Sequence, residues 1–166
     1  MIELTFVDES QAPIELDAET IADAVKMAIE QGISLRGVDL KEADLHTTDL
    51  SNADFSDAKL TDVDLRGAKM VGTNFTRAIL VNADLMSADL DDAVLSGADL
   101  DYACWPLWSY YLHAKIDKRL FCQLLYHTMR LGQSIDDAEV QALLNDPAAL
   151  SLANQFHHVT EYGKLK

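Results

Sequence analysis

Residues 83–100 read ADLMSADLDDAVLSGADL, with a leucine at every fifth position. The same spacing runs in both directions, so that a large apolar residue stands at every fifth position from Leu35 to Trp105 without exception. A small or β-branched residue precedes each of them by two places. A period of five fits neither an α-helix (3.6) nor a β-strand (2). The pattern therefore predicts a backbone that turns in the same direction every five residues.

The other places of the five-residue unit carry two further signals. The residue before the large one is usually aspartate. The last place favours residue types that tolerate turns, namely Gly37, Gly67, Gly72, Gly97, Asn52 and Asn82. This unit resembles the Ala-Asp/Asn-Leu-x-x repeat of the pentapeptide-repeat family, as in Ala43-Asp44-Leu45 and Ala98-Asp99-Leu100. The resemblance covers residues 33–107 in fifteen units.

The resemblance implies a mainly β fold with helical caps, in which the repeat forms a right-handed quadrilateral β-helix. Such a solenoid has four units in each twenty-residue coil, so residues 33–107 are expected to form about 3.75 coils. The large residue and the small one two places earlier point inward. Positions twenty apart then stack, which places Phe55 over Phe75 in the core.

The segments on either side of the repeat are expected to cap its two ends, because an open solenoid exposes backbone and apolar interior. Residues 1–32 are predicted to form a β-hairpin and a helix. Apolar and polar residues alternate over residues 2–6, and a return strand is expected at residues 14–16. Thr20 and Asp23 have capping-box spacing at the start of a helix that ends at Gly32.

Residues 108–166 are predicted to form a helical cap or tail, with helices at 118–131, 134–145 and from 146 onward. The repeat breaks at Pro106, next to an aromatic and apolar cluster. The cluster comprises Trp105, Leu107, Trp108, Tyr110 and Tyr111. It is either covered by the tail or forms a C-terminal dimer interface, as in some members of the family. The sequence is therefore compatible with a monomer and with a C-terminal homodimer.

Charge narrows the choice of partners. The chain has 166 residues, 28 acidic and 13 basic, with a net charge of −15 and a pI of about 4.4. Residues 1–32 contribute −7 and residues 33–107 contribute −8, whereas residues 108–166 are neutral. This balance argues against direct binding to nucleic acid or to an anionic membrane, since both need a basic surface. It suits a soluble protein or one whose partner is basic.

Neither export nor catalysis is indicated. The N-terminal residues lack the pattern of a signal peptide, and no apolar run is long enough to span a membrane. We therefore expect a cytoplasmic protein of bacterial or phage origin. The two cysteines and five histidines show no metal-binding spacing. No nucleophile, acid-base pair or phosphate loop is evident. We therefore expect no metal, no cofactor and no enzymatic activity.

The acidic residues of the repeat are the main candidate for a binding surface. The candidates are Asp44, Asp64, Asp84, Asp89, Asp91, Asp92, Asp99 and Asp101. Stacked acids repel, and Lys59, Arg66, Lys69 and Arg77 are expected to relieve this in the middle coils. After Arg77 the repeat has no base.

Two interpretations of this acidic ladder are open. It is either a polar coat or a mimic of duplex DNA, since some members of the family are DNA-like inhibitors of DNA gyrase. A rod of about 18 Å at strand spacing corresponds to roughly ten or eleven DNA charges, or about half a turn of duplex. The implied partner is a basic nucleic-acid-binding protein, either a topoisomerase or a host nucleic-acid defence complex. The alternative is a scaffold or regulatory protein that binds through its helical tail.

Overall fold

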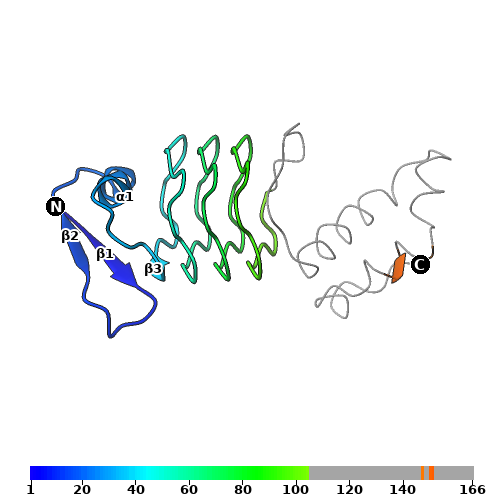
Figure 1. Cartoon of the computed structure of the whole chain (residues 1–166), viewed down its shortest axis with the longest axis horizontal. Coiled ribbons are helices and arrows are strands. Elements are labelled where there is room, and N and C mark those ends of the chain that lie inside the picture. Colours follow the sequence, from blue (N-terminus) through cyan, green and yellow to red (C-terminus); the bar gives the residue numbers. More distant parts are fainter. Residues whose placement is uncertain (105–146, 148–149, 152–166) are drawn as a thin grey trace. The chain divides into compact units, whose positions relative to one another are not determined.

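The computed structural model describes residues 1–104, 147 and 150–151. The chain begins with a β-hairpin, in which β1 (Ile2–Phe6) pairs antiparallel with β2 (Ile14–Leu16). Leu4 lies opposite Ile14 in this register, and Leu4 and Leu16 are buried. The hairpin and the following helix lie at one end of a stack of coils (Figure 1).

The helix α1 (Ile21–Glu30) begins and ends where the sequence indicates. The Thr20 hydroxyl accepts the backbone N–H of Asp23 at 3.1 Å, which satisfies one of the free donors of the first turn. The apolar face of α1 places Ala24, Val25 and Ala28 in the core. Gly32 follows with a positive φ of 66°, a conformation that glycine adopts without strain.

A third strand joins the hairpin to the first coil. This strand, β3 (Val38–Asp39), pairs antiparallel with β1, giving the sheet order β2-β1-β3. The Val7 N–H donates to the Gly37 carbonyl at 2.8 Å and extends the pairing by one bond. The sequence does not indicate this strand, since two residues are too few for an alternation signal.

The repeat forms the right-handed quadrilateral β-helix that the resemblance to the family implies. Parallel bridges join residues twenty apart, as in Asp44 to Asp64 and Asp64 to Asp84. Each bridge consists of paired backbone hydrogen bonds: the Leu45 N–H donates to the Asp64 carbonyl at 2.9 Å, and the Asp64 N–H donates to the Ala43 carbonyl at 3.0 Å. Figure 1 shows the resulting stack, coloured from cyan to green along the chain.

The core is a set of stacked columns of large apolar side chains. Phe55 and Phe75 stack as expected, with ring centroids 5.7 Å apart and planes within 9° of parallel. Leucines and one methionine fill the other columns and are almost fully buried. Thr73 takes one of the small inward positions, and its hydroxyl donates to the Leu50 carbonyl at 2.8 Å. The buried polar group is thereby satisfied.

The corners of the coils have left-handed backbone conformation at every fifth residue from Gly37 to Tyr102. Glycine supplies four of these corners, and ten residues with side chains supply the rest. Thr47 is the one β-branched residue among them, at φ 54°. Left-handed conformation is costly for such a side chain, so the stack enforces it at this position.

The C-terminal predictions lie almost wholly outside the described residues. Pro147, Leu150 and Ser151 are helical, in the segment where the third tail helix is predicted. The described residues do not include the cluster at residues 105–111, the other predicted helices or the predicted boundary at residue 108. By compactness the chain divides into residues 1–116 and 117–166. Across the described part of the chain, every helix is too short or too polar to cross a membrane.

Candidate functional site

The aspartate before each large residue has a structural role that the sequence analysis missed. In Asp84, Oδ1 accepts the backbone N–H of Met86 at 3.0 Å, which closes a turn at the side of the coil. All eight aspartates at this position make the same bond: Asp39, Asp44, Asp49, Asp54, Asp64, Asp84, Asp89 and Asp99. Asn74 does so with its amide oxygen. The turn therefore needs the oxygen acceptor but not the negative charge.

The coils bring the predicted acids into columns. Asp44, Asp64 and Asp84 form one column through successive backbone bridges. In the neighbouring column Lys69 lies between Asp49 and Asp89. Like charges at strand spacing repel, and a base inserted between two acids relieves the repulsion.

The bases of the middle coils pair mostly with the coil that precedes them. The Lys59 ammonium is 2.9 Å from Asp39 Oδ2, and the Lys69 ammonium is 3.5 Å from Asp49 Oδ2. Arg77 likewise reaches back twenty residues, with Nε 2.7 Å from Asp57 Oδ1. All three pairs place the positive charge toward the N-terminal end of the solenoid. The predicted relief of the ladder is thus present in these three pairs, whereas Arg36 pairs in the other direction, with Asp57 at 2.8 Å.

Arg66 is the exception, because it pairs within its own unit. Its Nε lies 2.9 and 3.1 Å from the two carboxylate oxygens of Asp64 and 3.8 Å from Asp84 Oδ2. The hydrogen bonds from the guanidinium outweigh the opposing effect of burial and hold the pKa of Asp64 at about 2. In Asp57 the hydrogen bond from Arg77 likewise lowers the pKa of the carboxyl group.

Acidic charge without a basic partner gathers at the C-terminal end of the described solenoid. Within residues 1–104, no lysine or arginine pairs with Asp89, Asp92 or Asp99. Asp89 and Asp92 are exposed, and Asp91 between them is half-buried. This unit, residues 88–92, therefore presents three carboxylates on one side of the last coil, and we call it the acidic unit.

Asp101 does not join this surface. The sequence places it at an outward position of its unit, but the side chain is only 7% exposed. It lies in the last unit that is described in full, residues 98–102, and an outward position guarantees exposure only where nothing covers that part of the coil. Asp101 is therefore removed from the candidate residues that a partner could contact directly.

A second cluster combines residues that the sequence analysis did not connect. The ligand atoms of Asp44, His46 and Asp64 lie within 4.8 Å of one another. The Asp44 carboxylate hydrogen-bonds His46 Nδ1, which raises the pKa of the imidazole. The Arg66 guanidinium occupies both oxygens of Asp64 and places a positive charge at the cluster. We therefore assign no metal to it. The twenty-residue coil length is the signal that could have connected these residues.

The family comparison matches the solenoid. A family model described as pentapeptide repeats matches residues 31–67 and 68–104 in eight copies. A comparison with curated protein sequences gave no match.

Solved structures that are similar to this chain include three proteins with pentapeptide repeats. QnrB1, a plasmid-mediated fluoroquinolone resistance protein, is 15% identical over 60% of this chain and 45% of its own, with a TM-score of 0.47. HetL of the cyanobacterium Nostoc sp. PCC 7120, involved in heterocyst differentiation regulation, is 25% identical over 49% of this chain and 50% of its own (TM-score 0.26). Rfr23 of the cyanobacterium Cyanothece 51142 is 29% identical over 48% and 57% (TM-score 0.23). This chain spans about half the length of each.

Proposed function

The chain belongs to the pentapeptide-repeat family, and from that premise we propose that it binds a basic nucleic-acid-binding protein through the acidic C-terminal part of its solenoid. Proteins of this family are generally structural or binding modules. The partner would be drawn in by electrostatic steering, and the proposal includes no catalytic step.

The observation that carries the proposal is the uneven neutralisation of the ladder. Lys59, Lys69 and Arg77 each reach back to the preceding coil. The base in the same coil as the acidic unit, Arg77, is engaged with Asp57, and Lys69, one coil before Asp89, is engaged with Asp49. A surface that served only solubility would not need its unneutralised acids gathered at one end.

The finer proposal is mimicry of duplex DNA and inhibition of the bound protein. Fourteen acids and six bases give residues 33–107 a net charge of −8. Duplex DNA carries about one charge per 1.7 Å, so the described rod approaches its charge density over about half a helical turn. The groove that it fits is short and basic. DNA gyrase is the first candidate, because DNA-like members of the family inhibit it, and a host nucleic-acid defence complex is the second.

Capture from a bacterial lysate tests the proposal. The full chain is immobilised, and bound proteins are displaced first with duplex DNA and then with salt. We expect a nucleic-acid-binding protein in the DNA-displaced fraction. The proposal is wrong if duplex DNA displaces no such protein. Inhibition of supercoiling by purified gyrase is the direct test of the first candidate.

Two further parts of the proposal concern the C-terminal residues and the location. A scaffold role through the tail, residues 108–166, and a C-terminal homodimer are the alternatives, and both rest on residues outside the described part of the chain. Deletion of residues 113–166 separates the tail from the solenoid, provided that circular dichroism shows an intact solenoid. Loss of the partner would favour the tail. A cytoplasmic location is part of the proposal, since its partners are cytoplasmic.

A further inference from the structure

The first coil has a backbone edge that is only partly paired. Through β3, the hairpin covers one of the four sides of this coil. On the side formed by residues 48–52, the N–H and carbonyl of Asp49 and the carbonyl of Ser51 have no hydrogen-bond partner among the described residues. The N–H and carbonyl of Asp54 are also without one. Such an edge is a template for another strand.

The same groups are paired one coil further on. The Lys69 N–H donates to the Thr48 carbonyl at 2.9 Å, and its carbonyl accepts from the Leu50 N–H at 2.8 Å. The Val71 carbonyl accepts from Asn52 at 2.9 Å. Asp49 and Ser51 are the equivalents of Lys69 and Val71 one coil earlier. Their backbone groups therefore have the arrangement that pairs with a preceding coil, but among the described residues no strand pairs with them.

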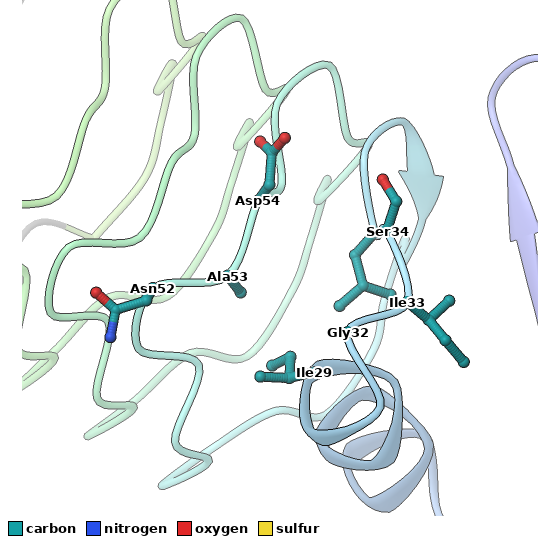
Figure 2. Close-up of a pocket in the computed structure, with 8 residues that line it drawn as sticks. Ile29, Gly32, Ile33, Ser34, Asn52, Ala53 and Asp54 are labelled. Atoms are coloured by element: carbon teal, nitrogen blue, oxygen red, sulfur yellow. The ribbon is translucent and has the colours of Figure 1, made fainter.

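The helix α1 lies beside this edge without pairing with it, and a groove separates the two. A helix satisfies its own backbone groups and so cannot pair with the coil. One hollow of about 460 Å³ lies between α1 and the coil, lined by Lys26, Ile29, Glu30, Asp49 and Ser51. A second, of about 250 Å³, shares Ile29 and continues along the same edge to Ala53 and Asp54. Figure 2 shows Ile29 reaching from α1 toward the coil, with Ala53 and Asp54 on the coil wall.

The charges along this groove favour a cation. Three acidic side chains, Glu30, Asp49 and Asp54, line it, against one base, Lys26. Among the described residues, no lysine or arginine pairs with Glu30 or Asp54. Ile29 offers an apolar surface between them. The groove thus combines free backbone groups, an aliphatic floor and a negative rim.

We propose that this groove binds a short extended segment of a partner protein that carries lysine or arginine beside an aliphatic side chain. The segment adds to the first coil as an outer strand and pairs with Asp49 and Ser51. Its aliphatic side chain packs on Ile29, and its cation lies near Glu30 and Asp54. The chain turns every five residues, so the paired stretch is about five residues long. This surface lies at the opposite end of the solenoid from the acidic unit and is independent of it.

The test uses a defined probe, the peptide acetyl-Lys-Val-Lys-Val-Lys-Val-Lys-amide, and the full chain. Amide hydrogen exchange is measured by NMR with and without saturating peptide. Exchange at the Asp49 N–H should slow by about tenfold or more on binding. The Asp44 N–H lies on another side of the same coil and has no partner in residues 1–104, so it is the internal control and should not change. Equal protection of both amides, or of neither, would overturn the proposal.

A second peptide separates strand pairing from simple charge attraction. The matched control is the same peptide with N-methyl groups on its three valines, which removes backbone donors and keeps every charge. We expect it to bind at least about tenfold more weakly, since the hydrogen bonds donated by the valine N–H groups are lost. Equal affinity for the two peptides would refute backbone pairing.

Two variants locate the site on the protein. Glu30→Gln and Ile29→Ala should each weaken the unmethylated peptide by about two- to fivefold. Asp62→Asn, on a distant side of the solenoid, is the control and should bind like the native chain. If Asp62→Asn weakens binding as much as Glu30→Gln, the peptide responds only to the net charge of the chain, and the proposed site is wrong. Self-association of the chain without peptide, seen by sedimentation, would instead make a second copy the occupant and overturn the proposal.

Discussion

Lys69 stacks one coil after Asp49 and one coil before Asp89, and its ammonium lies 3.5 Å from the Asp49 carboxylate. Lys69 thus neutralises Asp49 on its N-terminal side, and Asp89 on its C-terminal side has no cation among the described residues. Lys59 and Arg77 also pair with the acid twenty residues before them, whereas Ile79 and Gly97 occupy the positions twenty residues after them. The solenoid is therefore electrostatically polar, with its neutralised coils toward the N-terminus and its acidic unit toward the C-terminus.

The pairing of Arg66 with Asp64 predicts a specific change in titration. Arg66→Gln removes the guanidinium, so the pKa of Asp64 should rise from about 2 toward its ordinary value of 3.8. A depressed pKa stabilises the folded state above pH 3.8, and this contribution is lost as the pH falls through 2. As the pH falls from 3.8 to 2, the free energy of unfolding of Arg66→Gln should therefore fall less than that of the native chain. Carboxyl ¹³C NMR titration measures the pKa directly.

Arg77→Gln is the matched control, because it removes the partner of Asp57 instead. The pKa of Asp57 should rise in this variant, while that of Asp64 stays at about 2. The assignment fails if Asp64 titrates at the same pH with and without Arg66.

His46 provides a test near neutral pH. The hydrogen bond and negative charge of Asp44 raise the pKa of His46 above 6.5. A raised imidazole pKa stabilises the folded state below pH 6.5, and this contribution is lost as the pH rises through the folded value. Asp44→Asn should lower the pKa of His46, measured by ¹H NMR of the ring. An unchanged pKa would show that Asp44 is not the cause.

The stacked phenylalanines predict the cost of opening the core. Phe75→Ala should lower the free energy of unfolding by about 3–5 kcal/mol, because a cavity replaces a ring that packs on Phe55. Phe75→Leu keeps most of the volume, as the leucines elsewhere in the columns do, and should cost less. Urea denaturation followed by circular dichroism measures both. A smaller loss for alanine than for leucine would contradict the packing described.

The corners predict opposite effects for two substitutions at equivalent positions. Thr47→Asn should stabilise the chain by up to about 1 kcal/mol, because asparagine tolerates the φ of 54° that strains a β-branched residue. Gly72→Thr should destabilise it by about 1–3 kcal/mol. A Cβ at Gly72 would also lie 2.8 Å from Asn52 Oδ1, so that side chain must move. Thermal denaturation of both variants checks the signs.

The repeat and its core could be predicted from the sequence because each five-residue unit carries its own signal. The large residues recur without a gap from Leu35, and turn-tolerant types mark the corners. The start of α1 could be predicted from the spacing of Thr20 and Asp23, since capping is local.

Features that depend on contacts between coils could not be predicted. Lys69 stacks between two acids, and sequence alone does not say which of them its flexible side chain reaches. The short strand β3 and the cluster around His46 depend on residues distant in sequence. The repeated aspartates drew attention as charges, whereas their first role is to close turns.

The central claim is that the acidic unit contacts a basic nucleic-acid-binding protein. The most direct test is the affinity for the captured partner, with DNA gyrase tried first, at 50 and 200 mM NaCl. It compares the native chain with Asp89→Asn/Asp91→Asn/Asp92→Asn, in which asparagine keeps the turn that Asn74 already makes. Glu3→Gln/Glu9→Gln/Glu19→Gln removes three exposed charges at the other end as a control. We predict that the native chain binds at least about tenfold more weakly at 200 mM than at 50 mM NaCl. The aspartate variant should bind at least about tenfold more weakly than the native chain, whereas the glutamate variant should bind like it. Affinity that is independent of salt, or equal in the two triple variants, would contradict the claim.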